Sequence, residues 1–321
     1  MTVSSLALAQ AVPTIGASGG GESMVPYRGT SVSYGASSTV YNYSESTLAV
    51  SHRLGLMPEW HFGDVLTLRS RFFLTQELTQ SDSTTYRSEV ELSDLWLDAV
   101  WGGFRERVTG IRIGADLRFT LPTSKFSQFS SRIMTVGPGA NVSKTFKVLG
   151  GLTLVYSARF TGRFHRFTTR QNLGPAISNA GCGGTVTTTD LIDATACRTN
   201  TGVTNIIFDV IHGPTVVFNP HARLNIAASL FMQRGWVPAL SATELVPAVP
   251  MQTRDFIGFS LGVTYQPWDV VGFTLGAFTF ANQLDSEGKT IFPLFNRNTV
   301  ASLDATFDLE AVVSSITKEK K

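Results

Sequence analysis

Residues 111–121 alternate between apolar and polar side chains without a break. The odd positions carry Ile, Ile, Ala, Leu, Phe and Leu, and the even positions carry Arg, Gly, Asp, Arg and Thr. A period of two predicts a β-strand with one apolar and one polar face. The segment is longer than the usual soluble strand of about five or six residues. A chain built from such strands must cover each apolar face, either with a protein core or with lipid.

The same alternation recurs along the chain and predicts eleven further strands. Short turns and long loops alternate strictly between them, which is typical of transmembrane barrels. An even number of strands places both chain ends on the short-turn side, and the weakly patterned segment 27–35 is predicted as a strand mainly because this parity requires it. The further strands are residues 27–35, 48–57, 65–78, 90–102, 132–146, 152–164, 206–218, 224–233, 257–265, 271–278 and 301–310.

Composition argues against two classes of protein. Twenty-six Lys and Arg residues against 24 Asp and Glu residues leave no basic footprint for nucleic acid, so we expect no nucleic-acid partner. No apolar run approaches the roughly 20 residues that a transmembrane helix needs. The 29 Gly and 22 Phe residues favour turns and strands over helices. A helical membrane protein is therefore not expected.

Three tryptophans help to distinguish a membrane barrel from a soluble sandwich. Trp60, Trp101 and Trp268 all lie at predicted short turns, as an aromatic girdle at one membrane interface requires. The alternative is a soluble barrel whose end is plugged by aromatic side chains. A sheet in lipid must also close on itself, because an open edge would leave backbone groups unpaired. We therefore predict an all-β fold, a closed antiparallel up-and-down transmembrane β-barrel of about 12 strands, with membrane lipid as its partner.

The chain ends and the two cysteines are predicted to lie outside the barrel wall. Residues 1–11 resemble the end of a signal peptide, and an ordinary flexible N-terminus is the alternative. Residues 12–25 are expected to form a flexible periplasmic segment, 26–312 the barrel and 313–321 a charged tail. Cys182 and Cys197 fall in one polar loop, and we expect them to form a disulfide there. Metal binding by two cysteines alone is the weaker alternative.

The step from strand to loop at residues 118–124 carries a short motif. Arg118-Phe119-Thr120-Leu121-Pro122-Thr123-Ser124 resembles the L-P-T-[GS] step of outer-membrane barrels associated with phenol-degradation pathways. The architectural resemblance, from about residue 25 onwards, is to outer-membrane β-barrel transporter-like proteins of Gram-negative bacteria. It implies a location in the bacterial outer membrane and the passive passage of small solutes. The alternative is a non-conducting structural or binding barrel whose external loops contact partners.

Hydrolytic chemistry finds little support in the sequence. Ser51 and His52 are adjacent, but alternation sends their side chains to opposite faces. His165 is predicted to point inwards without a glycine-flanked nucleophile nearby. Five scattered histidines offer little for metal ligation. We expect no enzymatic activity, no cofactor and no metal site, while a homo-oligomer stays open.

The polar faces predict which residues line the interior. Charges of both signs on consecutive strands predict a lateral salt-bridge ladder, in which Asp94 lies beside Arg118. Asp98 is expected near Arg71 and Arg112. Arg159 and Arg163 are expected to be unpaired and to face an acidic strip across an off-centre aqueous path. Opposed charges across the path set up a transverse electric field, which orients dipolar solutes and gives only a weak net preference between cations and anions. The predicted pore-lining residues are Arg69, Arg71, Asp94, Asp98, Arg112, Asp116, Arg118, Arg159, Arg163, Asp304, Asp308 and Glu310.

Overall fold

The computed structural model describes residues 25–40, 48–79, 88–148, 150–171, 200–239, 251–284 and 288–319. Within these ranges no helix is long and apolar enough to cross a membrane. The secondary structure is almost entirely β. The elements are β1 (Ser31–Thr39), β2 (Val50–Met57), β3 (Glu59–Phe62), β4 (Leu66–Glu77), β5 (Val90–Leu92), β6 (Leu95–Arg105), β7 (Arg112–Leu121), α1 (Lys125–Phe129), β8 (Arg132–Phe146), β9 (Leu152–His165), β10 (Thr169–Gln171), β11 (Asn200–Thr204), β12 (Phe208–His221), β13 (Leu224–Val237), β14 (Gln252–Trp268), β15 (Val271–Asn282), β16 (Val300–Asp308) and α2 (Leu309–Glu319).

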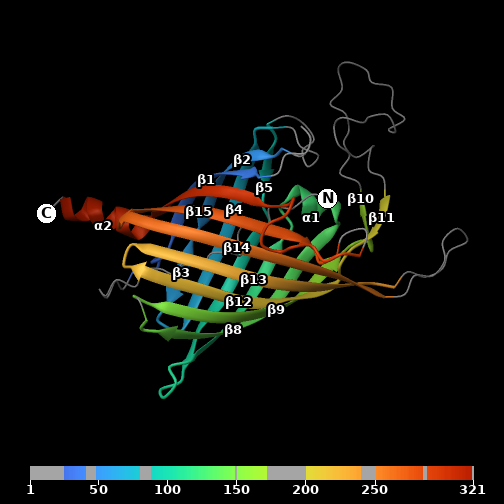
Figure 1. The fold of residues 1–321 in the computed structure, drawn as a ribbon. Helices are drawn as coiled ribbons and strands as arrows, with labels where there is room; N and C mark the ends of the chain where they lie inside the picture. The colour runs from blue at the N-terminus through green and yellow to red at the C-terminus, as the bar shows by residue number, and fades with distance from the viewer. Residues whose placement is uncertain are drawn as a thin grey trace, which may run out of the picture.

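The main sheet closes into a barrel (Figure 1). Its strand order runs β2-β1-β16-β15-β14-β13-β12-β9-β8-β7-β6-β4, and the pairing of β2 with β4 closes the ring. β2 and β3 lie on either side of Pro58, and both pair with the same edge of β4. β5 and β6 both pair with the other edge of β4. Each of these two pairs is therefore one wall strand that is interrupted once. The wall therefore has twelve strands, all antiparallel. The predicted closed 12-stranded barrel is confirmed.

Long connections gather at one end of the barrel and short turns at the other (Figure 1). The hairpin of β10 and β11 and helix α1 belong to the long-loop end, whereas α2 extends from the short-turn end. Strand β1 is present, as parity required, but it begins four residues later than predicted. We refer below to these two ends as the loop end and the turn end.

The last strand ends earlier than the sequence predicted. Strand β16 stops at Asp308, and α2 begins at Leu309. The Asp308 carboxylate accepts a hydrogen bond from the backbone N–H of Ala311 at 3.1 Å, which is the usual way in which an aspartate starts a helix. Glu310 therefore lies in the first turn of α2 and not on the wall, so its predicted place in a strand is wrong.

Side chains on the wall follow the predicted alternation. The outward residues Leu117, Leu261 and Leu275 are 37%, 41% and 62% exposed although they are apolar. Trp60, Trp101 and Trp268 are also exposed, and each lies next to a turn at the turn end. Charged and hydroxyl side chains occupy the alternate, inward positions. An apolar band outside and polar groups inside are the reverse of a soluble protein and match a transmembrane barrel.

Candidate functional site

Two inward ion pairs each span three strands with a glycine between the charges. Asp116, Gly139 and Arg159 are direct register partners on β7, β8 and β9, and Arg159 Nη2 donates to Asp116 Oδ2. A Cβ on Gly139 would lie 2.6 Å from Asp116 Oδ1. The missing side chain therefore lets two charges on strands about 10 Å apart meet above the middle strand.

The second three-strand row joins the first, second and last strands of the wall. Arg53, Gly35 and Asp304 are register partners on β2, β1 and β16, and Arg53 Nη2 donates to Asp304 Oδ1 at 3.1 Å. A Cβ on Gly35 would lie 1.9 Å from the same oxygen. Asp304 is thus neutralised, Asp308 starts α2 and Glu310 lies on that helix. The predicted acidic strip does not form.

Both arginines that were predicted to be unpaired have carboxylate partners. Besides the Arg159 pair, Arg163 Nε donates to Asp209 Oδ2 at 2.6 Å, and Gln233 Nε2 donates to Asp209 Oδ1 at 3.0 Å. The prediction of a transverse field set by free Arg159 and Arg163 is therefore wrong. Sequence reasoning missed Asp209 because the segment 206–218 has an ambiguous phase around its glycine and proline.

The predicted salt-bridge ladder exists, but with a different register. Arg118 lies directly opposite Asp98 and donates to it through Nε at 2.6 Å and Nη2 at 2.8 Å. The guanidinium of Arg118 also lies over the ring of Trp96, 4.2 Å from its centre. Asp98 is thus paired with Arg118, not with Arg112, and Asp94 is not beside Arg118.

The remaining predicted lining residues occupy the turn half of the barrel. Arg69 Nε donates to Glu59 Oε1 at 3.0 Å, and Arg69 is also the register partner of Asp98. Arg71 lies opposite the buried Trp96. Arg112 is exposed at the turn end and faces Arg105. Glu59 was missed by sequence reasoning because it lies beside the proline that interrupts its strand.

At the loop end, Asp94 anchors helix α1. The Asp94 carboxylate is fully buried and accepts three hydrogen bonds, from Arg132 Nη1 at 3.0 Å, Ser127 Oγ at 2.6 Å and the Ser124 backbone N–H at 3.0 Å. Ser124 is the last residue of the strand-to-loop motif and caps α1, since its side chain accepts from the Ser127 N–H. The motif therefore has a structural role, to bring α1 back onto the barrel.

Further contacts hold α1 against several strands at the mouth. Lys125 Nζ lies 2.7 Å from Glu89 Oε1, and the Arg170 guanidinium lies 5.1 Å from the Phe126 ring centre. The Ser130 carbonyl bonds to His165 Nδ1 at 2.8 Å and accepts from Asn205 Nδ2 at 2.9 Å. These partners lie on or next to β5, β9, β10 and β11. Helix α1 therefore covers part of the loop-end opening.

The same opening carries a group of guanidiniums. Arg170 lies on the β10–β11 hairpin and bonds to Asn205 Oδ1 at 3.3 Å. Burial, together with the nearby charges of Arg254 and Arg163, lowers the pKa of Arg170 to about 10. The group stays charged at neutral pH, so positive potential gathers on this side of the mouth.

The interior is not packed solid. The side chains of Arg53 and Asp304 keep 18% and 17% of their exposure in mid-wall, whereas Asp94 under α1 keeps none. The charged rows inside the closed wall therefore keep part of their surface accessible. Some inward glycines leave no open space, because a neighbouring side chain fills it: at Gly258, an atom of the Phe231 ring lies 2.1 Å from where a Cβ would be.

Among the described residues, His52 and His165 each bond to neighbouring side chains or backbone groups. His52 lies on the outer face and bonds to Tyr34 Oη at 3.1 Å and Gln76 Oε1 at 2.8 Å. Within the part of the chain that the structure describes, His165 bonds only to the backbone carbonyls of Ser130 and Ile206. No group of three or more metal-ligating side chains occurs within those ranges. Cys182 and Cys197 lie outside the described residues, as does the segment 1–24, so the disulfide stays a prediction that intact-mass analysis with and without reductant can test.

No protein-family model matches the chain, and no curated protein sequence matches it. Solved structures do match. An outer membrane channel from Pseudomonas putida F1 is 13% identical, covering 88% of this chain and 95% of that one with a TM-score of 0.52. The NanC porin (9% identical, 87% and 99% covered, TM-score 0.43) and the KdgM porin (8%, 87% and 98%, 0.40) are more distant. The chain therefore has the fold of an outer-membrane β-barrel channel.

Proposed function

We propose that this protein lies in the outer membrane of a Gram-negative bacterium and lets small polar solutes diffuse through its interior. The observation that carries the proposal is the solvent-accessible inner wall, where Arg53 and Asp304 remain partly exposed inside a closed ring. In a barrel of twelve strands, water has room where the side chains lie flat against the wall and do not extend across the interior. The glycine-centred rows produce that arrangement.

The wall charges favour dipolar solutes over simple ions. Each ion pair on the wall presents a guanidinium next to a carboxylate, as at Arg159 and Asp116 or Arg118 and Asp98. Adjacent charges of opposite sign cancel at a distance, so they select weakly between cations and anions. Close to the wall, they offer paired donors and acceptors to a solute that replaces water. Entry at the loop end is narrowed by α1.

Single-channel recording in planar bilayers tests the proposal. We expect discrete conductance steps with a reversal potential close to zero in a salt gradient. A tryptophan at inward Thr264 should lower the conductance, and a tryptophan at outward Leu261 is the matched control on the same strand. A parent protein without conductance steps, or equal conductance for the two variants, contradicts the proposal.

The second candidate is a non-conducting barrel that acts through its external loops. The anchored α1 supports it, because Asp94, Arg132 and Ser127 fix this helix over part of the mouth. If the barrel is non-conducting, the parent protein gives no conductance steps in the bilayer, and the Asp94→Ala protein, in which α1 is released, gives none either. Steps that appear only in this variant would instead indicate a channel closed by α1.

A further inference from the structure

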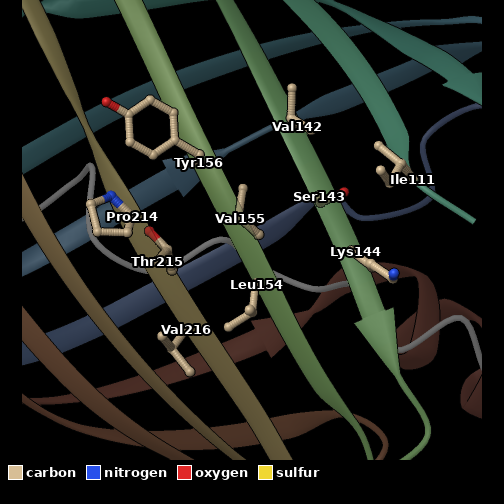
Figure 2. A pocket seen from close by; sticks show the side chains of 10 residues that line it. All are labelled: Ile111, Val142, Ser143, Lys144, Leu154, Val155, Tyr156, Pro214, Thr215 and Val216. Carbon is tan, nitrogen blue, oxygen red and sulfur yellow. The ribbon is translucent and has the colours of Figure 1, made fainter. Parts of the chain in front are cut away.

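A shallow apolar groove lies on the outer face of the barrel (Figure 2). Its volume of about 310 Å³ equals that of about ten water molecules. Two rows of register partners on β8, β9 and β12 form it: Val142, Tyr156 and Pro214, then Lys144, Leu154 and Val216. Nearly all of its accessible lining is apolar. Water gains no hydrogen bonds there, so the groove suits a hydrocarbon chain.

Tyr156 closes the end of the groove that is farther from the turns. Its ring rises from β9 (Figure 2), and its hydroxyl forms a 2.8 Å hydrogen bond with His212 Nδ1 on β12. The bond satisfies two polar groups on an apolar face and holds the ring in place. Val142 and Pro214 on either side are short. The groove therefore runs from Tyr156 towards the turn end.

A lysine stands at the turn end of the groove. Lys144 points outwards with the groove residues, and its ammonium lies 5.1 Å from the ring centre of Phe146. No carboxylate within the described residues forms an ion pair with it. Lys147 follows on the exposed turn. Lysines at this depth extend their ammonium groups to the membrane interface, where lipid phosphates lie.

The adjoining turn carries more positive than negative charge. Glu106 is the acidic residue of the β6–β7 turn, and its carboxylate accepts hydrogen bonds from the backbone N–H groups of Val108 and Thr109. Arg105 and Arg107 flank it and are exposed. The turn end next to the groove is therefore net positive, whereas the groove itself is apolar. This combination matches a molecule with an anionic head and a hydrocarbon tail.

We propose that this groove is a binding site for an anionic phospholipid of the leaflet at the turn end. One acyl chain lies along Leu154, Val142 and Val216 as far as Tyr156, and the phosphate contacts Lys144 and Lys147. The proposal requires the barrel to lie in a membrane, but it does not depend on conduction. A silent barrel that retains a selective lipid would refute the channel and keep the lipid site.

Native mass spectrometry of the full chain in a neutral detergent tests the proposal. The probes are phosphatidylglycerol and phosphatidylcholine with identical acyl chains, because they share the tail and differ in net charge. We expect one phosphatidylglycerol to bind preferentially. Lys144→Gln should weaken it about fivefold and reduce the preference, since one cation near a phosphate is worth about that factor. Arg28→Gln, which removes a charge at the same end but on the opposite side of the ring, should change nothing.

A second pair of variants tests the tail site. Leu154→Trp fills the groove and should abolish tight binding of both lipids, whereas Leu275→Trp, at an outward position on β15, should behave as the parent. Both replace one apolar outward residue by another, and thermal unfolding checks that each barrel is intact. Equal affinities for the parent and Lys144→Gln, or unchanged binding by Leu154→Trp, overturn the proposal. Dimers that exclude lipid also overturn it, because the groove would then face a second copy of the chain.

Discussion

Replacing Asp94 by alanine removes the acceptor at the centre of the α1 anchor. The carboxylate is fully buried, and the Arg132 side chain is 3% exposed. Removing one partner of a buried ion pair costs about 3–5 kcal/mol, because the other charge stays in a place without water. The Ser127 hydroxyl and the Ser124 N–H also lose their acceptor.

Local release of α1 limits how much unfolding free energy the Asp94→Ala protein can lose. If α1 leaves the mouth, water reaches the Arg132 guanidinium and the two serine groups, so the loss in unfolding free energy should stay near the lower figure of about 3 kcal/mol. For a chain of 321 residues, an unfolding entropy of about 2.1 cal/mol/K per residue converts this loss to a fall in Tm of roughly 4–5 °C. The double variant Asp94→Leu with Arg132→Met removes both charges and should recover most of the loss.

Denaturant unfolding in lipid vesicles, followed by tryptophan fluorescence, measures these values. Conductance provides a second measurement, because release of α1 should enlarge the step of the Asp94→Ala protein. Arg69→Gln, which breaks a more exposed pair with Glu59, serves as a control for removal of an inward charge. The reasoning fails if Asp94→Ala and Arg132→Met each unfold within about 1 kcal/mol of the parent, or if the double variant is the least stable of the three.

Three further predictions follow from other parts of the barrel. Gly258→Ala places a Cβ 2.1 Å from the Phe231 ring, so it should lower the unfolding free energy by about 1–3 kcal/mol in a thermal scan. Gly272→Ala is the control, because the nearest atom to its Cβ is 3.9 Å away, and it should leave the unfolding free energy unchanged. Leu117→Arg puts a charge on the outer face and should destabilise the barrel by about 2–4 kcal/mol in vesicles; an unaffected barrel would mean that this face does not meet lipid. Turn hydrogen bonds lower the pKa of Glu106 from 4.5 to about 2. They therefore stabilise the turn fully above pH 4.5, and this stabilisation is lost as the pH falls through 2. A carboxyl NMR titration with a midpoint near 4 would disprove this.

The sequence by itself determined the wall of this protein. A two-residue period fixes which side chains face outwards, and the lengths of the segments and connections fix an even, up-and-down strand order. Leu117, Leu261 and Leu275 lie on the apolar phase of this alternation, and they are exposed apolar residues in the structure. The period depends on local backbone geometry, which needs no knowledge of the partner strands.

The pairing of charges across the wall was decided only by the tertiary structure. Asp98 meets Arg118 because the register of β6 against β7 follows from a turn of several residues and a shift between Trp101 and Phe104. A change in register moves every pair, although the alternation along each strand stays the same.

The three-strand rows also needed the closed ring. Arg53 and Asp304 are separated by 251 residues, and they meet because β1 lies between the second strand and the last one. Alternation shows that both charges point inwards, but closure makes them neighbours and Gly35 leaves the space above β1 for them to touch. The faces of the strands were therefore local information, whereas the contacts inside the barrel arose from register and closure, which the chain acquires only when all twelve strands are assembled.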